Sequence, residues 1–139
     1  MGALGGNNNI INVDFTGVKD SNFINLVDGL IYTGEITKVE KTVSKNGNDQ
    51  LVWDIKVETE EGNCNVRNWT VLKHEALFAL KNLLKAIDPT MNLEGDIDLD
   101  LNSFIGAKLR FIAQVSERDG KVYNNVKTFL PPQDEEGLI

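Results

Sequence analysis

The sequence contains very little cysteine or histidine. Cys64 is its only cysteine and His74 its only histidine. A single thiol excludes an internal disulfide framework and a cysteine-rich zinc site, and a single imidazole excludes a histidine-rich metal site. Cys64 shares the inward face of a predicted strand with Val66, so we expect an inert core thiol. We expect His74 at the surface rather than paired with that thiol.

Long hydrophobic runs are also missing. No apolar stretch approaches the roughly 20 residues that a membrane-spanning helix needs. Residues 1–9 are mostly glycine and asparagine and lack the basic and apolar regions of a secretory signal peptide. We therefore expect no membrane association, a cytoplasmic location and a disordered N-terminus over residues 1–9.

Basic residues are fewer than acidic ones, 14 against 21, and the formal net charge is −7. As an average, this charge argues against a nucleic-acid binder, whose electrostatic footprint is basic. Seven of the acidic residues, however, fall in one loop and in the C-terminal tail: Glu94, Asp96, Asp98 and Asp100, then Asp134, Glu135 and Glu136. Without them 21 − 7 = 14 acidic residues face 14 basic ones, so the remainder of the chain is balanced in charge.

The length of 139 residues suits one domain, which we place at residues 10–132, followed by an acidic tail over 133–139. Alternating apolar and β-branched residues predict five strands, at residues 30–44, 51–59, 63–69, 105–116 and 121–130. Asn46-Gly47 and Asp119-Gly120 predict tight hairpin turns. Gly34, inside the first strand, predicts a bulge or sharp bend. Residues 23–27 fit either a helical turn or a packing plug.

One segment follows a helical period instead. Apolar residues between Val71 and Ile87 recur every three to four positions, with Thr70 as the candidate N-cap and Asp88-Pro89 as the stop. Three strands, one helix and two further strands predict a mainly β fold. The connectivity is that of a five-stranded oligonucleotide/oligosaccharide-binding (OB) barrel with its helix between strands 3 and 4. A simple α+β sheet covered by one helix is the alternative.

The outward positions of the predicted strands and turns combine cations with aromatic rings. Candidate phosphate contacts are Lys41, Lys45, Arg67, Lys108, Arg110 and Lys127, with Arg118 and Lys121 in a turn beside them. Trp69 and Tyr123 are candidates for base stacking, and Asn125 lies on the same face as Tyr123. Scattered cations with aromatic faces suit single-stranded nucleic acid, since phosphates need positive charge and unpaired bases need a ring to stack on. The alternative is that these basic side chains only solvate the outer faces of the strands. We assign Trp53 to the core.

Five short motifs carry a family resemblance: Gly29-Leu-Ile-Tyr-Thr-Gly-Glu-Ile, Lys45-Asn-Gly-Asn-Asp-Gln-Leu, Ile105-Gly-Ala-Lys, Asp119-Gly-Lys-Val-Tyr-Asn-Asn-Val and Phe129-Leu-Pro. Over about residues 13–139 the chain resembles a bacteriophage single-stranded DNA-binding protein with an OB fold. The resemblance implies that the protein coats single strands in phage DNA replication, recombination or repair, in the cytoplasm of the host.

The acidic tail strengthens this resemblance. It ends in Asp134, Glu135, Glu136, Gly137, Leu138 and Ile139, similar to the tails of such proteins, which are acidic and end in apolar residues. The resemblance implies that the tail recruits replication or recombination proteins and competes with DNA for the basic groove. Leu138-Ile139 stands where an aromatic terminus is often seen, and a frayed, solvated end is the alternative.

Other chemistries find little support in the sequence. Asp96, Asp98 and Asp100 suggest a calcium loop, but the required glycine and glutamate positions are occupied by Leu101 and Ala107. A charged loop or an edge strand protected by acidic residues explains the pattern better. There is no glycine-rich phosphate loop, and nothing selects a pair of catalytic carboxylates. We predict no enzyme, no metal and no cofactor.

Two functions follow from these patterns. The first is sequence-tolerant binding of single-stranded DNA; the sequence does not separate this from RNA binding, because that choice depends on contacts to one hydroxyl group. The second is a protein-interaction module on the same barrel, whose acidic loop and tail bind a basic partner. A homodimer through the first hairpin or through residues 10–28 is compatible with either function.

Overall fold

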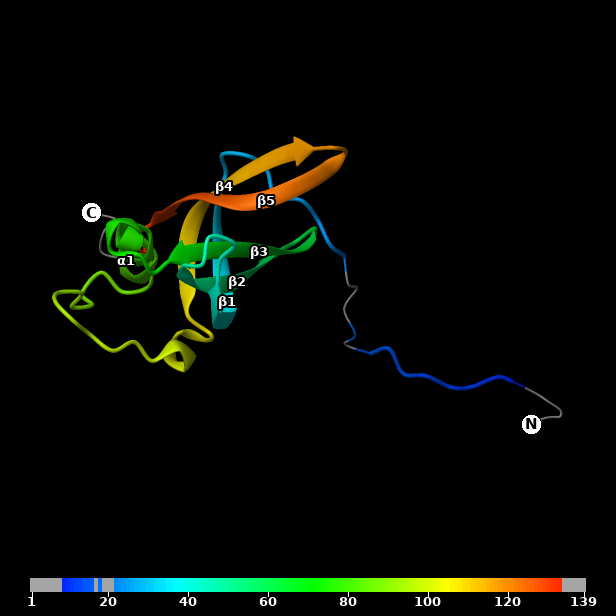
Figure 1. The fold of residues 1–139 in the computed structure, drawn as a ribbon. Helices are drawn as coiled ribbons and strands as arrows, with labels where there is room; N and C mark the ends of the chain where they lie inside the picture. The colour runs from blue at the N-terminus through cyan, green and yellow to red at the C-terminus, as the bar shows by residue number, and fades with distance from the viewer. Residues whose placement is uncertain (1–8, 17, 19–21, 134–139) are drawn as a thin grey trace.

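A computed structural model describes residues 9–16, 18 and 22–133 of the chain. Its elements are, in order, β1 (Ile31–Val43), β2 (Asp49–Thr59), β3 (Gly62–Val71), the 3-10 turn η1 (His74–Ala76), α1 (Leu77–Ile87), the 3-10 turn η2 (Leu101–Phe104), β4 (Lys108–Arg118) and β5 (Lys121–Leu130). The five strands form one antiparallel sheet in the order β3-β2-β1-β4-β5. The predicted mainly β fold, with one α-helix between the third and fourth strands, is therefore confirmed (Figure 1).

The long first strand joins the two halves of the sheet. Residues 31–35 of β1 pair with β4 and residues 35–43 pair with β2, with an irregularity in register between Ile36 and Lys38. Gly34 lies just before this irregularity, and a Cβ atom there would collide with the side chain of Ile55. The bend predicted from Gly34 thus falls two to four residues later, and the glycine itself permits a close approach to β2.

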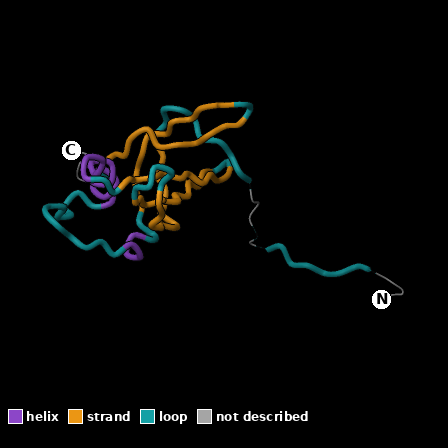
Figure 2. The backbone as a smooth tube through the Cα atoms, in the orientation of Figure 1, coloured by secondary structure: helices purple, strands orange, loops and turns teal. Residues whose placement is uncertain are grey.

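The ends of the sheet approach each other without joining. Cα atoms of β3 and β5 come within 8 Å of one another, and α1 packs against β3, β4 and β5. No ladder joins β3 to β5 among the residues that the structure describes, so the hydrogen-bonded sheet is open. The helix lies at one end of the curled sheet, and a long loop leads from it to η2 and β4 (Figure 2).

The core lies inside this curl. Trp53, Ile55, Phe111 and Ala113 are each fully buried, which confirms the predicted core position of Trp53. Its indole N–H donates a 2.9 Å hydrogen bond to the Thr70 hydroxyl, which is also buried. A buried polar group needs such a partner, because leaving it unpaired costs the full price of desolvation.

This hydrogen bond overturns the predicted helix cap. Thr70 belongs to β3, where its neighbour Val71 still pairs with Gln50 of β2. The helix begins only at Leu77, after η1, and its N-cap residue Ala76 has no side-chain cap. The ladder to β2 and the contact with Trp53 extend the strand over residues that a helical period alone would assign to α1. The apolar face predicted for the helix is confirmed, since Leu80, Leu83 and Leu84 are buried.

Residues 22–30, which we call the plug segment, fill the space where β3 and β5 meet. The amide of Ile24 donates to the carbonyl of Asn63 at the start of β3, and the amide of Leu26 donates to the side chain of Asn124 on β5. Leu26 is 4% exposed. Of the two interpretations from sequence, the packing plug is confirmed and the helical turn is wrong: the segment is extended and pairs with its neighbours.

The fourth strand starts later than predicted. Residues 101–104 form η2 and Gly106 has a φ of +90°, so β4 begins at Lys108. The alternation of the strands predicted at 105–116 and 121–130 places Ile105 and Val122 inward, but Ile105 is 45% exposed and Val122, on β5, is 42% exposed, so both of these predictions are wrong. The turn at Gly106 removes Ile105 from the strand, and Val122 lies near the tip of the β4–β5 hairpin, where no core remains to cover it.

Candidate nucleic-acid interface

The outward side of β3 carries three exposed polar or aromatic side chains: Asn65, Arg67 and Trp69, which we call the β3 row. Cys64, Val66 and Thr70 lie between or beside them and are buried. This alternation follows from the strand, in which successive side chains point to opposite faces. Trp69 stands opposite Val52 of β2 and is 50% exposed, so about half of its surface is accessible to a ligand.

The outward side of β5 carries a similar set: Tyr123, Asn125 and Lys127, the β5 row. Tyr123 pairs with Ser116 and Asn125 with Gln114 across the β4–β5 hairpin, which places these four side chains on one face. Lys127 is exposed and lies at the register irregularity between β4 and β5. The row therefore offers an aromatic ring, an amide and a cation along one strand.

The fold brings these two rows together. The sheet order makes β3 and β5 its two ends, yet their Cα atoms come within 8 Å. Each is antiparallel to a strand that is itself antiparallel to β1, so β3 and β5 share one direction, and both lead towards α1 (Figure 1). Residues about 60 positions apart in the sequence thus border the same seam between β3 and β5, and the plug segment occupies the part of that seam near Asn63 and Asn124.

A cation also lies over the aromatic ring of the β5 row. The guanidinium carbon of Arg118 is 5.0 Å from the centroid of the Tyr123 ring. This distance is within the range of a cation–π contact, which holds the ring and the charge in a defined relationship. Arg118 and Lys121 stand opposite each other at the end of the hairpin, so the tip carries positive charge.

Ion pairs divide the predicted cations into two groups. Arg67 donates from Nε to Asp54 at 2.9 Å, and this hydrogen bond raises the pKa of the Arg67 guanidinium above its usual value. Lys41 and Asp49 lie 3.6 Å apart, and Lys108 and Glu35 lie 3.8 Å apart. Within the described part of the chain, four exposed cations take part in no ion pair: Lys45, Arg118, Lys121 and Lys127.

Some of the residues predicted to contact DNA lie away from the β3 row and the β5 row. Lys41 pairs with Leu51 in the ladder, whereas Trp69 pairs with Val52, so Lys41 and Trp69 lie on opposite faces of the sheet. Lys45 occupies the exposed turn between β1 and β2. Arg110 is half-buried and donates to the carbonyl oxygen of Pro131 at 3.1 Å, so its side chain holds the end of β5.

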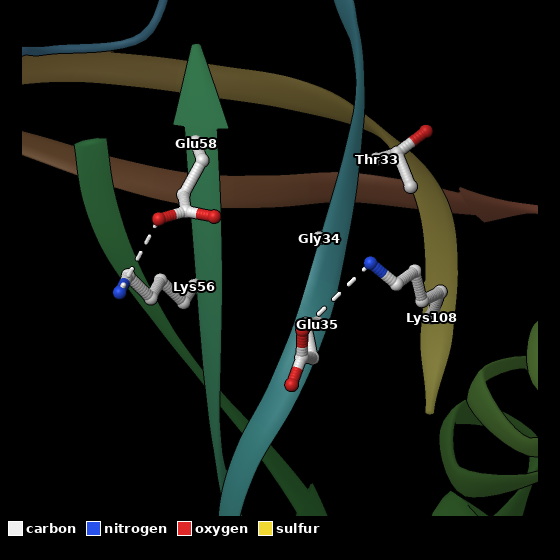
Figure 3. A pocket seen from close by; sticks show the side chains of 6 residues that line it. All are labelled: Thr33, Gly34, Glu35, Lys56, Glu58 and Lys108. Carbon is white, nitrogen blue, oxygen red and sulfur yellow. Dashed lines mark ion pairs between the residues drawn. The ribbon is translucent and has the colours of Figure 1, made fainter. Parts of the chain in front are cut away.

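Lys108 lines a pocket that the sequence did not indicate (Figure 3). The pocket has a volume of about 260 Å³ and lies over β1 where that strand changes partners, between β2 and β4. Two ion pairs border it, Lys108 with Glu35 and Lys56 with Glu58, the latter at 3.5 Å. With equal numbers of acids and bases on its walls, the pocket has no net charge to attract phosphate.

Residues 11–137 match the family model described as protein of unknown function (DUF669). The match covers the plug segment, all five strands and α1. The chain belongs to the DUF669 family. No curated protein matches the chain. The DUF669 match therefore establishes kinship over nearly the whole chain, and the chemistry has to be argued from the side chains themselves.

Metal and thiol chemistry find no support in this DUF669 chain. No group of three or more His, Cys, Asp and Glu side chains within the described ranges is arranged to hold a metal ion. Asp96, Asp98 and Asp100 belong to an exposed loop, not to an edge strand. Cys64 is buried and burial raises the pKa of its thiol, whereas His74 is exposed, as predicted for both. Residues 9–16, 18 and 22–133 contain no helix long and apolar enough to span a bilayer.

The described residues end at 133. The residues predicted for the partner-binding tail therefore lie outside them: Asp134, Glu135, Glu136, Leu138 and Ile139.

Sequence reasoning missed Gln114 and Ser116 as neighbours of Asn125 and Tyr123. The two-residue turn Asp119-Gly120 could have revealed them, since counting outward from it pairs residue 116 with 123 and 114 with 125.

Proposed function

We propose that the protein binds single-stranded DNA without sequence preference, in phage DNA replication, recombination or repair. One observation carries the proposal: exposed Arg67 and Trp69 on β3, and exposed Arg118, Tyr123 and Lys127 on the β4–β5 hairpin, lie on the outward sides of two strands whose Cα atoms come within 8 Å. Aromatic rings stack on bases of any identity, and cations contact the phosphates between them. Such a surface favours affinity over sequence readout.

The strand order supports an OB-type barrel as the scaffold. In that fold a long first strand pairs with both halves of the sheet, a helix stands between the third and fourth strands, and closure brings the third strand next to the fifth. The order β3-β2-β1-β4-β5, the position of α1 and the approach of β3 to β5 all agree with this scheme. OB folds bind oligonucleotides on the face of strands 2 and 3 and with the loops between strands 1–2 and 4–5. Trp69, Lys45 and the Arg118–Lys121 turn occupy those positions.

The strength of the proposed contact can be bounded. Stacking contributes about 1–3 kcal/mol per base. Trp69 and Tyr123 together would therefore account for a few kcal/mol, and the affinity would also depend on salt through the phosphate contacts.

The acidic tail completes the proposal. A chain segment with three adjacent carboxylates, Asp134 to Glu136, imitates the charge of a phosphate backbone and would compete for the cations of the hairpin tip. Its apolar end, Leu138-Ile139, would fill a pocket on a replication or recombination protein. Deleting residues 134–139 should then tighten DNA binding, and an unchanged affinity would reject this part of the proposal.

A fluorescence titration tests DNA binding directly. The chain has two tryptophans, and only Trp69 is exposed, so oligo-dT that stacks on it should quench the exposed component of the emission at low salt. Duplex DNA and single-stranded RNA of the same length, titrated in parallel, separate strand and sugar preference. Trp69→Phe should retain most of the binding, which is then followed by anisotropy of labelled oligo-dT, and Trp69→Ala should weaken it. Absence of binding to oligo-dT at micromolar protein and low salt would contradict the proposal.

A further inference from the structure

The N-terminal arm, residues 9–16, exposes a row of apolar side chains. Ile11 is 80% exposed, Val13 is 52% exposed and Phe15 is 71% exposed. They alternate with Asn12 and Asp14, a period of two that suits a strand half-covered by apolar surface. Ile10, at 85%, is also exposed and falls outside this alternation, whereas Ile11, Val13 and Phe15 would lie along one edge of an extended arm.

The plug segment carries a second uncovered apolar row. Ile24 and Leu26 point into the molecule and pack on the core, so the residues between and beside them point outwards. Phe23 is 79% exposed and Val27 is 56% exposed. The next exposed apolar residue is Leu30, at 51%, where the segment turns into β1.

The two rows match in length and chemistry. Phe23 and Val27 are four residues apart in an extended segment, as are Ile11 and Phe15, and four residues of strand span about 13 Å. The segment also presents backbone groups: Asn22 and Ile24 pair with Asn63, so the amides of Phe23 and Asn25 point away from β3. A strand laid along residues 22–27 would thus meet both apolar side chains and polar backbone.

We infer that the N-terminal arm of one copy of this chain lies along the plug segment of a second copy, and that the second arm lies along the first plug segment in return. The arm and its acceptor are on the same chain, so a two-fold arrangement satisfies both at once. Nucleic acid is a poor partner for the arm, because residues 9–16 contain no Lys or Arg and one acidic residue, Asp14. The inference does not rest on the proposed DNA binding.

The apolar side chains involved suit a dimer interface. A specific protein–protein interface buries about 1,200–2,000 Å² in total, and the reciprocal exchange would bring ten exposed apolar side chains into it, five from each copy: Ile11, Val13, Phe15, Phe23 and Val27. Pairing of the arm with the plug segment also accounts for why so much apolar surface is left outside the core of the curled sheet. The first hairpin is the competing dimer contact, since Val43 at its end is 65% exposed.

Sedimentation equilibrium of the full chain tests the inference. The wild type should have twice the mass of one chain at tens of micromolar, and so should Val43→Asp, the matched change in the first hairpin. Phe15→Asp in the arm and Phe23→Asp in the plug segment should each lower the mass to that of one chain. Circular dichroism should show unchanged folding for both variants, because both side chains are exposed.

Mixing the two defective variants adds a sharper readout. A Phe15→Asp chain keeps a sound acceptor and a Phe23→Asp chain keeps a sound arm, so their equimolar mixture should restore dimers through one of the two contacts. A monomeric wild type would overturn the inference, as an arm folded back on its own chain gives that result. A wild-type dimer abolished by Val43→Asp and unaffected by Phe15→Asp would also overturn it, in favour of the hairpin.

Discussion

Arg118 lies over the ring of Tyr123, with 5.0 Å between the guanidinium carbon and the ring centroid. The two residues stand near the tip of the β4–β5 hairpin, where the strands extend beyond the core. Tyr123 is still 38% exposed, so a base could stack on its ring, and the guanidinium beside the ring would place positive charge near the phosphate of that nucleotide. This pair is therefore the most direct place to test the proposed interface.

Replacing Tyr123 should weaken binding through loss of stacking. We expect Tyr123→Ala to lower the affinity for oligo-dT about 5- to 150-fold, the equivalent of 1–3 kcal/mol per stacked base. Tyr123→Phe keeps the ring and should stay close to the wild type. Anisotropy titration of labelled oligo-dT measures both variants. Equal losses for Ala and Phe would assign the effect to the hydroxyl and contradict stacking.

Removing one phosphate contact should change the salt dependence. Each contact contributes about −0.7 to the slope of log affinity against log salt concentration for single strands. Lys127→Gln should make the slope less steep by about that amount. Lys81→Gln makes the same charge change on the exposed side of α1 and serves as the control, with an unchanged slope. If both variants shift the slope alike, net charge rather than a contact at Lys127 is responsible.

The hydrogen bond between Trp53 and Thr70 should be important for stability. Thr70→Val keeps the shape of the side chain but leaves the buried indole N–H without an acceptor. We expect the free energy of unfolding to fall by about 1–3 kcal/mol, the usual cost of such an unpaired group. Urea denaturation followed by circular dichroism measures it. Thr33→Val, at an exposed position of β1, should have almost no effect, and equal losses at both sites would count against this explanation.

Cys64 should behave as a protected thiol. Burial raises its pKa above the ordinary value, so the folded protein disfavours the thiolate. Its contribution to stability is complete below the pKa of the unfolded thiol, about 8.5, and is lost as the pH rises from there through the folded pKa. A thiol reagent at pH 8 should modify Cys64 slowly in buffer and quickly in urea. Fast modification in buffer would place the thiol at the surface, and Cys64→Ala should show a flatter loss of stability between pH 8 and 10.

The sequence alone was sufficient for the elements whose signals are local. The alternation in residues 51–59 and 121–130, together with the turns Asn46-Gly47 and Asp119-Gly120, predicted strands that the structure confirms almost residue for residue. The apolar spacing of Leu80, Leu83 and Leu84 predicted the buried face of α1 for the same reason: both periods come from backbone geometry within one segment.

The boundaries of these elements needed tertiary contacts. Thr70 suits an N-cap by residue type, but the indole of Trp53, 17 positions earlier, holds it in a strand. Residues 23–27 suited a helical turn or a plug, and the choice depended on Asn63 and Asn124, which are distant in sequence. Local patterns could not decide either case, because the competing partners come from elsewhere in the chain.

The sequence likewise predicted only part of the candidate surface. Residue types and alternation identified Arg67, Trp69, Tyr123 and Lys127 as outward-facing. The curl of the sheet then decided that β3 and β5 lie side by side, that Lys41 is on the other face from Trp69, and that Arg67 and Lys108 stand beside carboxylates. A strand's own sequence determines which side chains leave it on the same face. Which strands meet, and which charges meet across them, depends on how the whole sheet curls around Trp53 and Phe111.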